Sequence, residues 1–408
     1  MIRTAALAAG LVLGAASARG AEPLTLAGAL ARAHADSPDI AAARADLDAA
    51  RGRLVQAGLF PSNPTVAASG THHHIPHATN VDNAVTVAQE VEVGGQRGLR
   101  VGAARHGVDR AERLLADRER TVDAEVRRAF AGLVAAQRRR VIDAEAATES
   151  KQLADAMATR LAHGDASGLD VELARIDALK QREDATSSDV EVVRAQRRVA
   201  LAIGAPPDET FAVTATDDPR PPTPPEAALV ARALAVRPDL AAARAERDRL
   251  DGEADVARRS GLVPNPTFRG FYSHENGEET LAGGEVEIPL PIWNRQQGTE
   301  TDLRGQAASA AADVVRLERQ IPRDVGTALA HERAARATWG RYRTETLPTV
   351  DAAHTSLARA LASGYLGLPE VLNQQDRLRA TRRSAVDAWL ALREAEAELI
   401  EAVGEDPW

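Results

Sequence analysis

Two groups of side chains in this sequence could bind a cation. The first is a histidine cluster, Thr71-His-His-His-Ile-Pro-His77, and imidazole is a common ligand of transition metals. Three interpretations of the cluster stay open: a structured metal site, a weak and transient cation contact, and a solvated loop, which we favour. They concern four side chains, His72, His73, His74 and His77.

The second group is formed by carboxylates in two stretches of alternating polarity. In residues 81–93, and again in 281–288, apolar side chains fall on one side of an extended chain and polar side chains on the other. Four glutamates share the polar side: Glu90, Glu92, Glu285 and Glu287. These glutamates either line a polar surface together or form ion pairs with nearby arginines such as Arg97 and Arg100.

Nothing in the sequence indicates catalysis. We find no Gly-x-Ser-x-Gly, Walker A, His-Glu-x-x-His or Rossmann pattern, and no cysteine that could act as a nucleophile or bind a metal. The 50 basic and 59 acidic residues give a net charge of −9, which disfavours nucleic acid as a partner. We therefore expect a protein that is not an enzyme and has no cofactor.

The first 20 residues have the features of a secretory signal peptide. Arg3 provides the positive charge, residues 5–16 are apolar, and small residues follow, so that cleavage is expected after Ala18 or Gly20. No later segment is apolar over the roughly 20 residues that a membrane-spanning helix requires. We expect an exported protein.

The chain repeats itself at an offset of 200 residues. Ser37-Pro-Asp-Ile-Ala-Ala-Ala-Arg-Ala45 returns as Arg237-Pro-Asp-Leu-Ala-Ala-Ala-Arg-Ala245, and three further matches follow in the same order. Residues 21–216 and 226–408 are therefore expected to be two copies of one structural unit. The proline-rich segment 217–225 would link them.

Each copy is expected to be mainly helical, and in each copy a β-hairpin precedes a very long helix. At 1.5 Å per residue, the long helix at 98–162 would extend about 98 Å. The first and return helices together match that length, so we expect an elongated antiparallel coiled coil with Pro322 as its one interruption. The expected helices are 24–59, 98–162, 169–203, 298–363 and 369–402, besides a first helix in copy two.

The two hairpins are expected at about 63–93 and 265–290, with loops around 71–80 and 274–279. Four short strands cannot close a membrane-spanning barrel, because such barrels start at about 8 strands and every backbone group in lipid needs a partner. The strands therefore close with those of other chains, or they form a small soluble sheet that caps a coiled coil. The expected fold class is mainly α with a small β part.

The order of these features resembles that of TolC-type outer membrane efflux proteins. Two segments carry the resemblance, Gln89-Glu-Val-Glu-Val-Gly-Gly-Gln-Arg-Gly-Leu-Arg100 and Ile288-Pro-Leu-Pro-Ile-Trp-Asn-Arg-Gln-Gln-Gly298, and the first is similar to the branch that exports cobalt, zinc and cadmium. The resemblance implies a homotrimer in the outer membrane of a Gram-negative bacterium, with twelve strands in one β-barrel and a helical barrel in the periplasm. It implies a periplasmic adaptor, an inner membrane resistance-nodulation-division pump and outer membrane lipid as partners.

The resemblance also implies roles for particular residues. The four glutamates would face the barrel lumen, where charged rings favour cations. The helical turns would contact the adaptor through Gly164, Gly168, Leu169, Gly364, Gly367 and Leu368. The periplasmic gate would lie at Glu370 and Asn373, with Asp170 as the equivalent in copy one. Since the family has an acidic residue where this chain has Asn373, other bonds, from Asn373, Arg377 or Arg379, would hold the closed state.

Two alternatives to a metal-exporting channel stay open. One is a periplasmic coiled-coil adaptor or structural protein, although two equivalent units, each with its own hairpin, are not expected of an adaptor. The other is a channel of the same family that exports organic compounds. The sequence does not identify the exported metal among zinc, cobalt, cadmium, nickel and copper, nor the cognate pump and adaptor.

Overall fold

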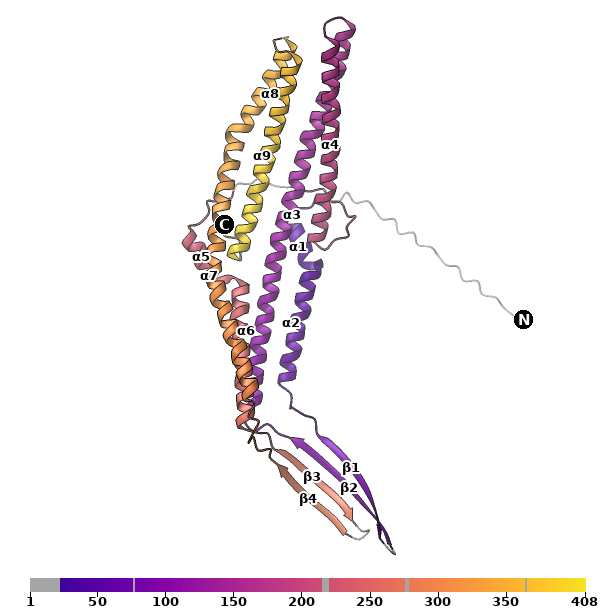
Figure 1. Cartoon of the computed structure of the whole chain (residues 1–408), viewed down its shortest axis with the longest axis vertical. Helices are drawn as coiled ribbons and strands as arrows, with labels where there is room; N and C mark the ends of the chain where they lie inside the picture. Colours follow the sequence, from indigo (N-terminus) through magenta and orange to yellow (C-terminus); the bar gives the residue numbers. More distant parts are fainter. Residues whose placement is uncertain (1–22, 76–77, 215–219, 276–278, 364) are drawn as a thin grey trace, which may run out of the picture.

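The protein is an elongated molecule with a small sheet at one end and two helical hairpins at the other (Figure 1). The computed structural model describes residues 23–75, 78–214, 220–275, 279–363 and 365–408. The expected signal peptide at 1–20 and residues 217–219 of the expected linker lie outside the described residues.

The two halves of the chain form the same elements in the same order. The first half contains α1 (Leu26–Asp36), α2 (Pro38–Ala57), β1 (Thr65–Ile75), β2 (Ala78–Glu90), α3 (Gln96–Ala162) and α4 (Gly168–Ala202). The second half contains α5 (Glu226–Val236), α6 (Pro238–Leu262), β3 (Thr267–Glu275), β4 (Glu279–Glu287), α7 (Gln297–Arg341), a π-helical turn (Tyr342–Thr346), α8 (Leu347–Ala362) and α9 (Leu368–Val403). The internal duplication expected from the sequence is thus a duplication of structure.

The expectation of a single first helix at 24–59 is wrong, because the chain breaks into α1 and α2 at Ser37. Ser37 is extended, with φ −64° and ψ 124°, since a residue before proline avoids the helical region. Pro38 then begins α2. Arg237 and Pro238 form the same break between α5 and α6.

The long helix of the second half is interrupted at a different place from the one expected. Pro322 lies inside α7 without ending it, between the fully buried Ile321 and Val325, whose packing stabilises the helix there. The interruption is the π-helical turn, shortly before Pro348. Because Pro348 cannot donate a helical hydrogen bond, a wider turn before it accommodates the missing bond.

The long helix α3 organises the helical part. Its 67 residues correspond to roughly 100 Å. Figure 1 shows α2 and α4 following one another along α3, and α6 and α9 beside α7 and α8. The main core lies around the middle of α3 and includes Ile40, Val126, Phe130, Leu133, Val199 and Trp389.

The four strands form one antiparallel sheet in the order β1-β2-β3-β4. Residue pairing continues to Ile75 with Ala78 in the first hairpin and to Glu275 with Glu279 in the second. The connecting loops are therefore shorter than expected at both hairpins. β1 and β4 are the edges of the sheet, and each has one side without a strand partner among the described residues.

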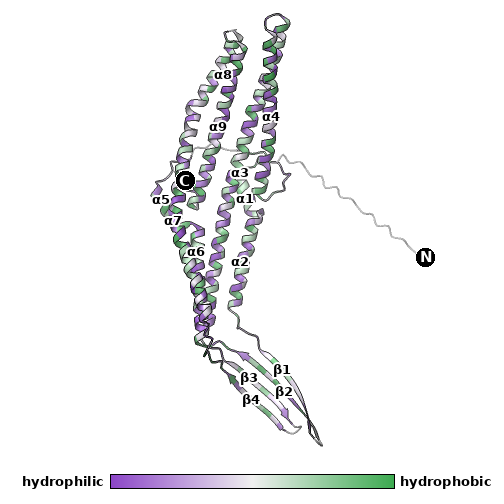
Figure 2. Cartoon of the chain, in the orientation of Figure 1, coloured by the Kyte–Doolittle hydropathy of each residue, from purple (hydrophilic) through white to green (hydrophobic). Residues whose placement is uncertain are grey.

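Hydrophilic and hydrophobic residues are mixed along the labelled helices (Figure 2). Within the part of the chain that the structure describes, no helix combines the length and the apolar character needed to cross a membrane.

Candidate functional site

The register gives the sheet two faces of opposite character, because directly paired residues share a face and faces alternate along each strand. One face carries Val66, Ala68, Val81, Val85, Val87, Phe268, Tyr272, Ala282 and Val286. Its large apolar side chains are exposed within the chain, from 38% at Val81 to 70% at Val66. Among the described strand residues, this apolar face has no Asp, Glu, Lys or Arg.

The opposite, polar face carries six carboxylates and one arginine among the described strand residues. They are Asp82, Glu90, Glu275, Glu279, Glu285, Glu287 and Arg269. Arg269 donates to Glu285 at 3.0 Å and to Glu287 at 3.2 Å. Glu90 accepts a hydrogen bond from Asn265 Nδ2 at 2.7 Å. One arginine cannot neutralise six carboxylates, so this face attracts cations.

Three of the four glutamates singled out in the sequence lie on the polar face, and the fourth does not. The expectation that Glu92 continues the strand is wrong, since the chain leaves the sheet after Glu90 to reach the left-handed Gly95 before α3. The Glu92 side chain is 7% exposed and accepts from Arg100 Nη1 at 2.5 Å. The ion-pair alternative is therefore observed for Glu92 with Arg100, whereas Glu285 and Glu287 pair with an arginine that the sequence had not indicated.

The histidine cluster lies on a strand rather than in the expected loop, because β1 continues to Ile75. His72 pairs with Val81 and His74 with Thr79, which places both on the apolar face at the end of the sheet far from the helices (Figure 1). The backbone of His73 also belongs to β1, and His77 lies outside the described residues. No three His, Asp or Glu side chains of the described residues are arranged to hold a metal ion.

The helical turns lie at the opposite end of the molecule from the sheet (Figure 1). Gly164 has φ +83°, the left-handed conformation expected where a helix ends. Gly168 begins α4 instead, and Gly367 is the extended residue before α9 with φ −72°. Gly364 lies outside the described residues.

The two turns differ in what they expose. Leu169, in the first turn of α4, is 68% exposed, whereas Leu368, the first residue of α9, is 6% exposed. Leu368 packs against Met157 of α3 and Val171 of α4. The first turn thus presents an apolar side chain to the surroundings, while the second uses its leucine to hold the two hairpins together.

Of the three predicted gate residues, Asp170 and Glu370 lie in the first turns of α4 and α9, and Asn373 lies in the second turn of α9. Asp170 closes a capping box with Ser167, whose hydroxyl donates to Asp170 Oδ2 at 2.7 Å and accepts from Asp170 N at 3.1 Å. Hydrogen bonds from the hydroxyl and the backbone of Ser167 lower the pKa of Asp170. Glu370 accepts from Gln374 at 2.6 Å, and both Glu370 and Asn373 are exposed.

Hydrogen bonds and ion pairs join α9 to α3 below the turns. We call this set the α3–α9 seam: Arg379 with Ser150, Arg383 with Asp143, and Asp387 with Arg139. Arg383 Nε donates to Asp143 Oδ1 at 2.7 Å, and the Asp143 side chain is 4% exposed. Arg379 is one of the residues that the sequence indicated for such bonds; Arg383 and Asp143 were missed. The spacing of four between Arg379 and Arg383 on α9 was visible in the sequence. The partner of Arg383, however, lies 240 residues away.

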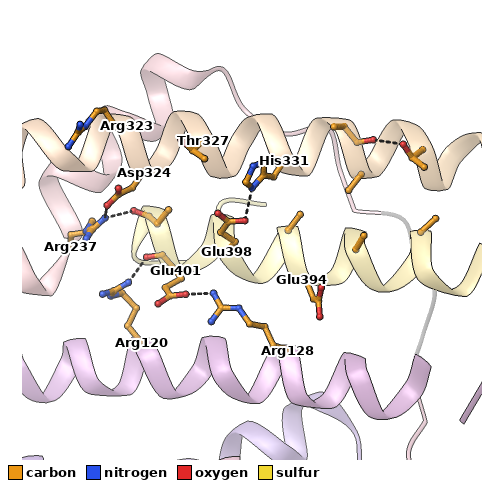
Figure 3. A pocket seen from close by; sticks show the side chains of 17 residues that line it. Arg120, Arg128, Arg237, Arg323, Asp324, Thr327, His331, Glu394, Glu398 and Glu401 are labelled. Atoms are coloured by element: carbon orange, nitrogen blue, oxygen red, sulfur yellow. Dashed lines mark hydrogen bonds and ion pairs between the residues drawn. The ribbon is translucent and has the colours of Figure 1, made fainter. Parts of the chain in front are cut away.

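A charged groove of about 1130 Å³ lies between α3, α7 and α9 (Figure 3). From α3, Arg120 donates to the carbonyl oxygen of Glu401 at 2.6 Å, and Arg128 bonds the carboxylate of the same residue. From α7, His331 Nδ1 lies 3.0 Å from Glu398 Oε2. Because these charges are already paired within the chain, we interpret the groove as a junction that joins three helices.

Comparison with known proteins gives a family match over the first repeat. Residues 29–205 match the family model described as outer membrane efflux protein. Most of the chain is similar to the cobalt-zinc-cadmium resistance protein CzcC of Cupriavidus metallidurans. The two sequences are 27% identical over 362 residues, which cover 87% of this chain and 84% of CzcC.

Solved structures of outer membrane proteins have the same fold. The channel protein CusC superposes with a TM-score of 0.76 at 18% identity, covering 93% of this chain and 92% of CusC. The outer membrane protein VceC of Vibrio cholerae superposes with a TM-score of 0.73 at 18% identity, covering 94% and 97%. The first repeat of the chain is therefore similar to outer membrane efflux proteins, and the chain as a whole has the fold of the channel protein CusC and the outer membrane protein VceC.

Proposed function

We propose that three copies of this chain form a channel that passively conducts heavy-metal cations, handed over by a periplasmic adaptor and an inner membrane resistance-nodulation-division pump. The observation that carries this proposal is the charge asymmetry of the sheet. If the apolar face contacts lipid, the polar face with its six carboxylates lines the lumen, and rings of carboxylates favour cations. The similarity to a cobalt-zinc-cadmium resistance protein supports divalent metals as the cargo.

Surfaces left uncovered by a single chain support the trimer. β1 and β4 are free sheet edges, which pair readily with other strands. Along α4, a stripe of large apolar side chains is 46–82% exposed: Leu169, Ile176, Leu179, Val190, Val193 and Leu201. Neighbouring copies would cover both the edges and the stripe, and so remove apolar area from water.

Fractionation and crosslinking test the assembly. The protein is expected in the outer membrane, where crosslinking should trap a three-chain species. A soluble periplasmic monomer would contradict the proposal.

Deletion of the chain is expected to lower the tolerance of its host to zinc, cobalt or cadmium and to leave tolerance to organic compounds unchanged. The reverse pattern would favour the channel for organic compounds.

The gate is proposed to lie at Glu370 and Asn373, with Asp170 at the equivalent place in the first half. Residues three apart share a helix face, and both side chains on α9 are exposed. In a trimer, three Glu370 carboxylates would form a ring in a narrow part of the tunnel, where polyvalent cations bind strongly. The adjacent turns, through the exposed Leu169 and through Gly164 and Gly367, are proposed to contact the adaptor.

The double variant Glu370→Ala/Asn373→Ala is expected to fold normally and to need about tenfold more of a trivalent cation for half-block of single-channel current, because the ring of charge is lost. Gln374→Ala is the control, since it removes the hydrogen-bond partner of Glu370 but no charge. Equal block in the double variant and the wild type would show that these residues do not form the ring.

A further inference from the structure

We propose that the segment 288–293, between β4 and α7, inserts into the periplasmic leaflet of the outer membrane and anchors the channel to phospholipid. The inference rests on the proposed channel. Four large apolar side chains of the segment are exposed: Ile288 56%, Leu290 72%, Ile292 57% and Trp293 86%.

The segment continues the apolar face of the sheet. Val286 is the last residue of β4 on that face, and beyond the end of β4 at Glu287 the apolar residues Ile288, Leu290 and Ile292 occupy every second position of the sequence. Pro289 and Pro291 alternate with them, so the intervening positions carry no charge and no backbone N–H. The exposed apolar side chains of the segment therefore follow the apolar face directly along the chain, on the way to the helices.

The apolar face of the sheet is too short to span the membrane by itself. Its apolar rows run from Phe268, whose row also contains Gln89, to Tyr272, and the next row contains Asn83, His274 and Thr280. Four residue steps give about 13 Å along the strand and about 10 Å in height for a tilted strand, against the ~25 Å apolar band of membrane barrels. The segment 288–293 lies at the helical end of the sheet, where its apolar side chains would add to the height of the apolar band.

Several backbone groups of the segment have hydrogen-bond partners within the chain, which lowers the cost of placing the segment in the membrane interface. Ile292 N donates to Leu290 O at 2.8 Å, and Gln297 Nε2 donates to the carbonyl of Trp293 at 3.1 Å. Arg295 Nε donates to Pro291 O at 3.1 Å. The carbonyl groups of Leu290, Pro291 and Trp293 are thus satisfied while the four apolar side chains stay exposed.

The helical part fixes the position of the segment. A side chain on Gly261 of α6 would overlap the carbonyl oxygen of Arg295, so glycine is required for this close approach. Trp293 can place its ring at the level of the headgroups, as tryptophans at membrane interfaces do. The exposed Arg258 and Arg295 lie on the helical side of the segment and suit phospholipid phosphates.

Labelling tests the anchor directly, since the chain has no cysteine. The single variants Leu290→Cys and Ile292→Cys are labelled with the fluorophore NBD and reconstituted in phosphatidylethanolamine–phosphatidylglycerol vesicles. A phospholipid with a nitroxide on its upper acyl chain is expected to quench both labels about threefold more than an aqueous nickel chelate does. Thr299→Cys, an exposed position in the first turn of α7, is the control and should show the reverse preference.

Two results would overturn the anchor. In one, labels at 290 and 292 are as accessible to the aqueous chelate as the label at 299. In the other, neither quencher reaches the labels and the single variant Ile292→Cys is crosslinked to another copy of the chain, which would show that a second copy covers the segment. Conductance of the same vesicles separates the two proposals: a conducting channel with water-exposed labels rejects the anchor alone, and an absence of conductance rejects the channel.

Discussion

The triple variant Glu90→Gln/Glu285→Gln/Glu287→Gln is expected to lose its preference for cations, with the K⁺/Cl⁻ permeability ratio falling from several-fold to about one. All three carboxylates lie on the polar face near the helical end of the sheet. Their removal leaves Arg269 there without its two carboxylate partners, so the local charge changes sign. The reversal potential in a KCl gradient across a planar bilayer measures the ratio.

Two single variants serve as controls for this prediction. Glu92→Gln should leave the permeability ratio unchanged, because the Glu92 side chain is 7% exposed and bonded to Arg100, and it should lower thermal stability instead. Arg269→Gln should increase the preference for cations, since it removes the one arginine of the polar face. A triple variant with the reversal potential of the wild type would show that the polar face does not line the conduction path.

The sequence predicted those features of the fold that depend on local pattern. Helix lengths follow from proline-free stretches, and the repeat at an offset of 200 residues identified the two equivalent units. The break at Ser37 was readable in principle, because Pro38 restricts the residue before it. The interruption at Tyr342–Thr346 could not be predicted from the sequence. Pro322 and Pro348 are both prolines, yet tertiary packing carries the helix through Pro322 and the helix is interrupted only before Pro348.

For the candidate site, the sequence predicted only which face of the sheet each side chain lies on. Alternation placed Glu90, Glu285 and Glu287 on one side of the sheet, and the register agrees. Alternation does not show where a strand ends, which is why Glu92 was misplaced. Nor does it show which residues of two strands face each other, so the pairing of Arg269 with Glu285 required the structure.

The second large effect is expected at the α3–α9 seam. Arg383→Ala leaves the nearly buried carboxylate of Asp143 without its cationic partner, with Ser188 as a remaining hydrogen-bond donor. Removing one member of a buried pair typically costs about 3–5 kcal/mol, and we expect about 1–2 kcal/mol here because the Arg383 side chain is 39% exposed and partly screened by water. Thermal unfolding of the assembled protein measures the loss.

Loss of this pair should also change the conductance of the channel. The seam joins α9, which carries the proposed gate residues Glu370 and Asn373, to α3 of the other hairpin. With the seam weakened, the hairpin of α8 and α9 can separate from that of α3 and α4. We therefore expect Arg383→Ala to raise single-channel conductance about twofold. The variant loses a contact that is made only in the closed state, so the balance between closed and open states shifts toward the open one.

The outer end of the seam provides a matched comparison. Arg139 and Asp387 also pair, at 3.0 Å, but their side chains are 35% and 57% exposed, so Arg139→Ala should cost less than about 1 kcal/mol and change conductance little. The double variant Asp143→Asn/Arg383→Gln removes both charges together and should recover most of the stability lost in Arg383→Ala. If Arg383→Ala lowers thermal stability but keeps the conductance of the wild type, the seam holds the two repeats together without controlling the gate.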